Sequence, residues 1–361
     1  MMNIALVALI VLWWALITYA ALGGADFGAG IWDLFAVGRQ ATRQRDFINH
    51  SLGPVWEANH VWLIFLIVGL FNVFPAAFQA LVTALFFPFT LALLGIVLRG
   101  AAFIFSYYAV DTAGPFARWW SRVFSLTSLV TPFFLGAAAA AVASGSLVRP
   151  DGTPAGFVHA WTTPFALVIG AMAVTLCASV AAVYMTVEAN NEHEQDLAES
   201  YRTKALVAGA ITAILGLLGL LLSISEAPSL WAGILSRAWP VAIAAMLIGL
   251  ATAAALFMQR YREARILIVA ETAFILSAWG LSQYPYIIPP HFTIANSANA
   301  PNVIITLLIC VAVGLVILLP SLYYLFSVFK LPYPVPGLRN KAREEQQQRR
   351  QGHKEQTQTH G

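Results

Sequence analysis

The chain has 361 residues, of which 59% are hydrophobic and 10% are charged. A soluble domain has about a quarter of its residues charged, so this composition excludes an ordinary soluble protein and indicates a polytopic membrane protein. The net charge of +3 says little by itself, and no nucleic-acid partner is expected. Cys177 and Cys310 lie in apolar runs without a neighbouring cysteine or histidine motif, so neither a disulfide nor a metal site is predicted from them.

Apolar runs long enough to cross a bilayer, which takes about 20 residues, recur along the chain. They predict an all-α fold with about nine transmembrane helices. The predicted spans are 4–35, 53–73, 78–110, 123–147, 161–187, 204–223, 239–259, 266–284 and 302–329. Residues 1–330 are expected to form the membrane domain, and 331–361 a basic, disordered cytoplasmic tail. Two four-helix bundles plus one peripheral helix fit the number of spans, although periodicity alone does not establish this arrangement.

Basic residues are unevenly distributed between alternate loops. The loops after the first, third, fifth and seventh spans hold Arg39, Arg43, Arg45, Arg118, Arg122, Arg202, Lys204, Arg260, Arg262 and Arg265, whereas the other loops hold Arg149 and Arg237. Positive residues favour the cytoplasmic side. The asymmetry therefore predicts a cytoplasmic C-terminus and an N-terminus on the outer face.

Asp26 lies in the first span among Gly23, Gly24, Gly28 and Gly30. An acid inside a membrane helix is costly and indicates a functional site unless it is paired. Glycines allow close helix packing and leave room for water beside a carboxylate. Asp26 is therefore either a protonatable station in a hydrated crevice or an acid that holds two helices in register.

Glu57 opens the second span, three residues before His60. An acid after Pro54 is also what a helix N-terminus favours, so a structural explanation stands beside a functional one. Residues three apart share a helix face, and histidine titrates near neutral pH. The pair is thus a candidate proton relay, with Asn59 nearby. Ligation of a metal or haem by His60 is the weaker alternative, because no second Glu-x-x-His motif occurs.

Arg99 is the one basic residue well inside a predicted span, and an unpaired cation there is unfavourable. We expect a structural ion pair, with Glu271 or Asp111 as candidate partners. Contact with a haem propionate or a quinone is the alternative.

Most of the tryptophans lie near predicted helix ends, as is typical of an aromatic belt. Trp62 lies deeper in its span. It is therefore a candidate for lining a path taken by a small apolar molecule.

Two blocks carry a family resemblance: Gly24-Ala-Asp26-Phe-Gly-Ala-Gly30 and Pro54-Val-Trp56-Glu57-Ala-Asn59-His60-Val-Trp62-Leu-Ile64. They resemble subunit II of the cytochrome bd-type quinol oxidases. Weaker matches are Phe74-Pro75, Leu98-Arg99-Gly100 and the region from Pro289 to Asn302. The resemblance covers nearly the whole chain.

The resemblance implies a bacterial plasma-membrane complex that oxidises quinol and reduces oxygen to water in the aerobic respiratory chain, taking protons from the cytoplasm. It implies a partner, subunit I, that holds haems b and d, or b alone. This chain would bind no haem itself, and a small third subunit and a structural quinone or lipid are compatible with it. Glu57 would be a proton-entry acid, Asp26 a further station, and Trp62 would lie near an oxygen route.

Two positions depart from the family pattern. Many relatives have Asp at the position of Glu57, and Gln or Glu at that of His60. With Glu57 and His60 at these positions, the sequence resembles a divergent, cyanide-insensitive branch of the family.

A proton-coupled secondary transporter is the alternative function. Such proteins often contain paired broken helices, and no second glycine-rich interruption is evident in this sequence. A membrane protein with its own haem is a third class, and it would need facing axial ligands.

Overall fold

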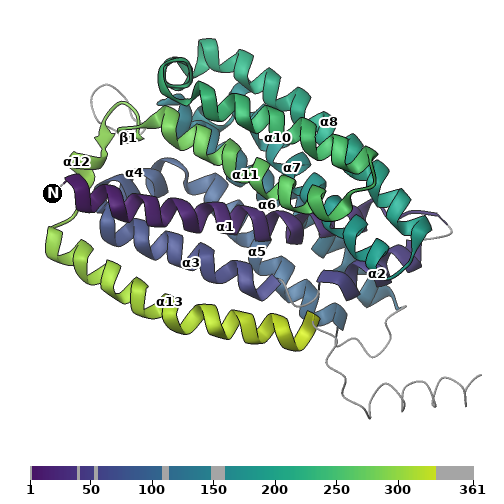
Figure 1. Ribbon diagram of the computed structural model, residues 1–361. Coiled ribbons are helices and arrows are strands. Elements are labelled where there is room, and N and C mark those ends of the chain that lie inside the picture. Colours follow the sequence, from purple (N-terminus) through teal and green to yellow (C-terminus); the bar gives the residue numbers. More distant parts are fainter. Residues whose placement is uncertain (1, 39–40, 53–55, 108–113, 148–158, 331–361) are drawn as a thin grey trace, which may run out of the picture. The chain divides into compact units, whose positions relative to one another are not determined.

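The computed structural model describes residues 2–38, 41–52, 56–107, 114–147 and 159–330. The described chain is almost entirely helical, and Figure 1 shows that the long helices before residue 300 lie side by side. The helices are α1 (Met2–Leu34), α2 (Ala41–Leu52), α3 (Trp56–Val73), α4 (Pro75–Ala84), α5 (Phe86–Tyr107), α6 (Pro115–Ser144), η1 (His159–Trp161), α7 (Pro164–Asn191), α8 (Gln195–Glu226), α9 (Pro228–Gly233), η2 (Ile234–Ala238), α10 (Trp239–Phe257), α11 (Tyr261–Gln283), α12 (Ile294–Ser297) and α13 (Pro301–Lys330).

Eight of the described helices are long and apolar enough to cross a membrane, or nine if the bent pair α3–α4 counts as one span. The prediction of an all-α polytopic membrane protein with about nine spans is therefore confirmed. The predicted tail, 331–361, lies outside the described residues, so the predicted domain boundary at 330 stays a prediction.

Eight of the helices before residue 300 contact one another in two groups of four. In the first group α1 contacts α3 and α6, and α5 contacts α6. In the second group α7 contacts α8 and α11, and α10 contacts both α8 and α11. Helices α1 and α6 also pack against α7, which joins the groups. This is the two-bundle arrangement expected from the number of spans.

The third predicted span, 78–110, is divided in the structure. Helix α4 starts at Pro75, bends by 120° from α3, and ends before Leu85, after which α5 begins. Proline favours the first turn of a helix and cannot continue one from its interior, so Pro75 places the bend. Pro88 lies in the first turn of α5, where it is also tolerated.

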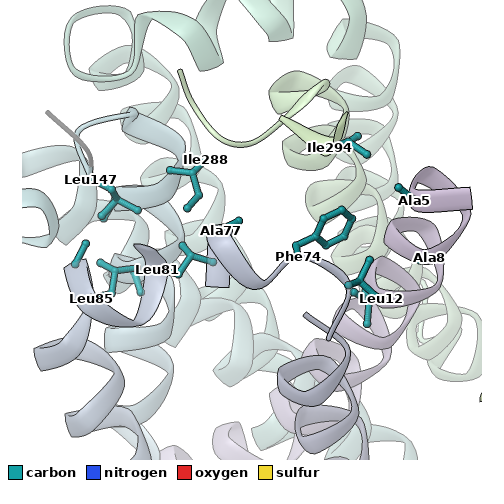
Figure 2. Close-up of a cluster of buried hydrophobic side chains, with 14 of the residues drawn as sticks. Ala5, Ala8, Leu12, Phe74, Ala77, Leu81, Leu85, Leu147, Ile288 and Ile294 are labelled. Carbon is teal, nitrogen blue, oxygen red and sulfur yellow. The ribbon is translucent and has the colours of Figure 1, made fainter. Parts of the chain in front are cut away.

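A buried apolar cluster closes the end of the first helix group at this bend. Phe74, Leu85, Leu147 and Ile288 are each 0% exposed and come from distant parts of the chain. Figure 2 shows these side chains between the bend, α1 and the loop that follows α11. That loop contains a small antiparallel hairpin, β1 (Tyr286–Ile288) and β2 (Phe292–Thr293). Burying the aromatic and aliphatic side chains stabilises the bend against the hairpin.

The basic segment after α1, which the sequence suggested was a loop, forms helix α2. Its Phe47 and Ile48 are buried, and Phe47 stacks on Tyr201 of α8 with ring centroids 5.9 Å apart. Arg45 of α2 forms an ion pair with Asp33 at 3.4 Å. Asp33 is 6% exposed, because it lies between Arg45 of α2 and Ser125 of α6, whose hydroxyl group donates to its carboxylate.

Candidate functional site

A buried ion pair joins α1 to α5 inside the first helix group. Arg99 is 4% exposed and Asp26 is 3% exposed. The Arg99 guanidinium is paired with the Asp26 carboxylate through Nη1 and Oδ2, and Nη2 donates to Asp26 Oδ1 at 2.6 Å. This two-point contact matches the planar geometry of both groups, so each buried charge compensates the other.

Further contacts orient the guanidinium of Arg99. Its Nη2 also donates to the main-chain oxygen of Asp26 at 2.8 Å, and its Nε donates to Ser128 Oγ of α6 at 2.8 Å. The guanidinium carbon lies 4.9 Å from the ring centroid of Phe27 and 4.6 Å from that of Phe124. Hydrogen bonds within its plane and aromatic rings beside it are favourable for this side chain. The charge is thereby held in one position.

Asn59 connects this ion pair to α3. Its Nδ2 donates to Asp26 Oδ2 at 2.9 Å, and the residue is 0% exposed. Glu57 and His60 lie two residues before and one residue after Asn59 on the same helix, within roughly 3 Å of it along the axis. His60 is partly buried, whereas the side chain of Glu57 lies outside the described part of the structure. The structure therefore places Glu57 and His60 close along α3 to Asn59, the residue of this helix that contacts Asp26.

Glycines on α1 permit the close packing around the cluster. A Cβ atom at Gly28 would lie 2.0 Å from the carbonyl oxygen of Cys177 on α7, and one at Gly30 would lie 2.1 Å from Ser128 Oγ on α6. Both positions therefore require glycine. The glycines beside Asp26 thus serve helix contact, and Gly30 also lets Ser128 reach the guanidinium of Arg99.

Several buried polar atoms close to this region have no hydrogen-bond partner among the described residues. They are the Asn59 Oδ1, Tyr19 hydroxyl and Thr131 Oγ1 atoms. The Tyr19 hydroxyl interacts electrostatically with Asp26 and Arg99, which places it near the ion pair. Buried polar groups in folded proteins are normally paired with protein or water, so these atoms mark positions where ordered water fits.

Trp62 lies on α3, less than one turn beyond His60 and partly buried. Its indole Nε1 is buried and has no acceptor in the described part of the chain. The indole therefore presents an apolar ring and one donor to its surroundings.

Residues that could ligate a metal ion or a haem iron are scattered in the described part of the chain. The described residues include no group of three or more His, Cys, Asp or Glu side chains that could hold a metal ion. Among the histidines whose side chains are described, His60 lies in a membrane helix, whereas His193 and His291 lie in connections between helices. A haem with two axial ligands needs two facing side chains, and the described histidines do not fit that requirement.

The fold and the buried cluster define an integral, all-helical membrane protein with a fixed ion pair inside its first helix group. Sequence comparison is more specific. The chain belongs to the family described as cytochrome bd terminal oxidase subunit II, which matches residues 4–329. Proteins of this family are subunits of an oxidoreductase complex. Family membership therefore decides against the secondary-transporter alternative.

Individual relatives agree with this assignment. A Bacillus subtilis (strain 168) protein named as a candidate cytochrome bd menaquinol oxidase subunit II is 25% identical over 336 residues, 90% of this chain and 95% of that protein. The cytochrome bd-I ubiquinol oxidase subunit 2 of Escherichia coli (strain K12) is 28% identical over 222 residues, 56% of this chain and 54% of that protein. In fold, the chain resembles the bd oxidase from Geobacillus thermodenitrificans, with a TM-score of 0.72, 24% identity, and coverage of 92% of this chain and 100% of that one.

Sequence reasoning did not name the acid that pairs with Arg99 in the structure. Glu271 lies on α11, in the second helix group, and Asp111 lies outside the described residues. The acid that pairs with Arg99 is Asp26, 73 positions away in the sequence. Ser128 was not singled out at all. The one signal for this pairing was that Asp26 and Arg99 were both costly membrane charges of opposite sign.

Proposed function

We propose that this chain is the subunit without haem in a quinol:oxygen oxidoreductase of the bacterial plasma membrane. The complex would oxidise quinol, reduce oxygen to water and build a proton gradient by taking protons from the cytoplasm. Family membership over residues 4–329 carries this proposal. The relatives are named as menaquinol and ubiquinol oxidases, so a quinol is the substrate class that they support.

The catalytic centre of this complex belongs, in our proposal, to a haem-binding partner, subunit I, with haems b and d or b alone. The lack of a facing ligand pair among the described histidines supports that division. A small third subunit, and a quinone or lipid with a structural role, are compatible with the same assembly. The role of this chain is then to support the haem subunit and to shape the access routes to it.

Glu57 and His60 form the proton-entry site in this proposal. Asn59 is the observation that carries it, because it lies between them in sequence and donates a hydrogen bond to Asp26. The unpartnered Asn59 Oδ1 and Tyr19 hydroxyl support a hydrated region beside the ion pair. Protons would enter at Glu57, pass to His60 and continue over ordered water.

Asp26 has a different part in this route. Its carboxylate accepts hydrogen bonds from the Arg99 guanidinium and from the Asn59 amide. Asp26 is therefore proposed as a station that attracts and orients a proton in neighbouring water, while Arg99 keeps its charge in place. The structural ion-pair role of Arg99 is preferred to contact with a haem propionate, because its guanidinium is already engaged by Asp26 and Ser128.

The orientation proposed is an outer N-terminus and a cytoplasmic C-terminus. The arginine-rich helix α2 and the β1–β2 hairpin lie at opposite ends of the helices (Figure 1), which supports two faces of different charge. The α2 face would be cytoplasmic by the positive-inside rule. Trp62, further along α3 than His60, is proposed to border an oxygen route, because its ring is a broad apolar surface.

Oxygen consumption by the purified complex tests the proton-entry site. Glu57→Gln should lower quinol-driven turnover at least tenfold and leave the visible haem spectrum unchanged, because general acid–base groups contribute about 10²–10⁴-fold to proton transfer. Glu57→Asp, which retains the acid, is the matched control and should recover most of the rate. Equal turnover in Glu57→Gln and the parent complex would exclude Glu57 as the entry acid.

Isolation of the tagged chain in mild detergent tests the wider assignment. A haem-bearing membrane partner should purify with it, and the pair should consume oxygen on added quinol. A stable chain that purifies alone and without colour would contradict the proposal.

A further inference from the structure

A second membrane acid, Glu271, lies in the other helix group and has no part in the proposed proton route. It is the eleventh residue of the 23-residue helix α11, so it lies near the middle of that span. Its side chain is partly buried. An acid at this depth is unfavourable as a bare charge and is by default a functional site.

The carboxyl group of Glu271 occupies a space that α10 leaves open. A Cβ atom at Gly249 would lie 2.9 Å from Glu271 Oε1 and 3.2 Å from its Cδ. Thr252, one turn further along α10, interacts with the same carboxyl group, while its hydroxyl donates to the Ile248 main-chain oxygen at 2.9 Å and keeps its lone pairs available to accept. Gly249 and Thr252 therefore form a small polar recess at the α10–α11 interface into which the acid points.

No ion pair within the described residues reaches Glu271. Helix α10 contains no charged residue. On α11 the nearest charged side chain, Arg265, is six residues earlier, roughly 9 Å along the axis, and it is paired with Glu188 of α7. At the other end of α11, Arg237 of η2 donates to the main-chain oxygen of Ser282.

The other titratable groups on elements that contact α11 also fail to supply a cation. On α1, Asp26 is paired with Arg99 and Asp33 is paired with Arg45. The remaining groups on α1, α7 and β1 are uncharged phenols and a thiol, at Tyr19, Tyr184, Tyr286 and Cys177. The two membrane acids thus differ in one respect: Asp26 has a guanidinium against it and Glu271 has none.

We propose that Glu271 is a second proton-binding site, whose carboxyl group holds a proton at neutral pH and is open to small apolar molecules from the membrane. A buried acid without a counter-ion neutralises by binding a proton. Its O–H then donates a hydrogen bond within the recess formed by α10. Access is supported by the exposure of Phe274, one turn along α11, and of Leu250, next to Gly249. This inference is independent of the proposed roles of Glu57 and His60.

Dicyclohexylcarbodiimide is the probe for this site, because it is apolar and reacts with protonated carboxyl groups. The acid adds its O–H across a carbon–nitrogen double bond of the reagent, and the O-acylisourea that results rearranges to a stable N-acylurea. The purified complex is treated at about pH 6 and about pH 9, on either side of neutrality, and the adducts are mapped by peptide mass spectrometry.

We expect an adduct on Glu271, at least threefold more abundant at the lower pH, and none on Asp26. Glu226 is an internal control, because its carboxylate accepts a hydrogen bond from the Phe165 main-chain nitrogen at the end of a helix. The denatured chain, treated in acid, shows that the Glu271 peptide is recovered. No adduct on Glu271 in the folded complex, or equal labelling of Asp26 and Glu271, would overturn the proposal.

Two variants make the test independent of reagent access. Glu271→Gln should remove one carbonyl-stretching band of a protonated carboxyl group from the infrared spectrum of the folded complex. Gly249→Ala places a methyl group 2.9 Å from Glu271 Oε1, and should shift this band and change the adduct yield at least threefold. An infrared spectrum that Glu271→Gln leaves unchanged would show that the acid is ionised, and would refute the proposal.

Discussion

Removing the charge of Arg99 is the sharpest test of the buried cluster. In Arg99→Leu the Asp26 carboxylate, 3% exposed, would keep Asn59 as its side-chain donor and lose its counter-ion. Removing one partner of a buried ion pair destabilises by about 3–5 kcal/mol. Since about 1.4 kcal/mol corresponds to a tenfold change in an equilibrium constant, the ratio of folded to unfolded chain should fall by roughly a hundredfold or more.

A double-mutant cycle separates the ion pair from simple loss of packing. Asp26→Asn removes the opposite charge, and the double variant Asp26→Asn/Arg99→Leu removes both. We expect the double variant to be less destabilised than the sum of the single variants by at least about 1.5 kcal/mol, since contacting residues couple by about 0.5–3 kcal/mol. Arg262→Leu, at an exposed position at the start of α11, is the control and should change stability by less than about 0.5 kcal/mol.

The measurements are the yield of assembled complex on size exclusion in mild detergent and its thermal unfolding midpoint. Arg99→Leu should lose assembled complex rather than give an assembled but slow enzyme. A fully assembled Arg99→Leu complex with an unchanged midpoint would refute the structural role of the ion pair. Purely additive effects in the cycle would show that Asp26 and Arg99 do not act on each other.

Three further outcomes are expected from other parts of the molecule. Gly28→Ala should prevent close packing of α1 on α7, because its Cβ would lie 2.0 Å from the Cys177 carbonyl oxygen. Gly209→Ala is the control, because its Cβ would make an ordinary contact at 3.5 Å. The measurement is the yield of assembled complex for each variant. The Glu226 carboxylate accepts a hydrogen bond from the Phe165 main-chain nitrogen at 3.0 Å. Glu226→Ala should therefore lower the unfolding midpoint by the equivalent of about 1.5–3 kcal/mol, the range for a hydrogen bond to a charged group. An unchanged midpoint would contradict the role of this carboxylate as a cap. A reporter fused to the C-terminus should respond as cytoplasmic, and activity on the outer face would reverse the proposed topology.

The amino-acid sequence was sufficient for the class of protein and for most of the long helices. Hydropathy is a property of each residue and its immediate neighbours, so a run of apolar residues predicts a span without knowledge of its neighbours in space. Proline also acts locally, which is why the bend between α3 and α4 lies at Pro75. The blocks around Asp26 and Glu57 led to the right family for the same reason, because contiguous motifs can be recognised within one stretch of chain.

Contacts between distant segments were decided by the tertiary structure. The partner of Arg99 depends on how α1, α5 and α6 are rotated about their axes, and no hydropathy pattern specifies those rotations. The burial of Asp33 likewise depends on α2 folding back with Arg45 and Phe47, from a segment that looked like a loop. A charge inside a membrane protein could be identified from the sequence as one that needs a partner. The packing of the helices decides which residue becomes that partner. Before the helices are placed, acids on several different helices meet the same electrostatic requirement equally well.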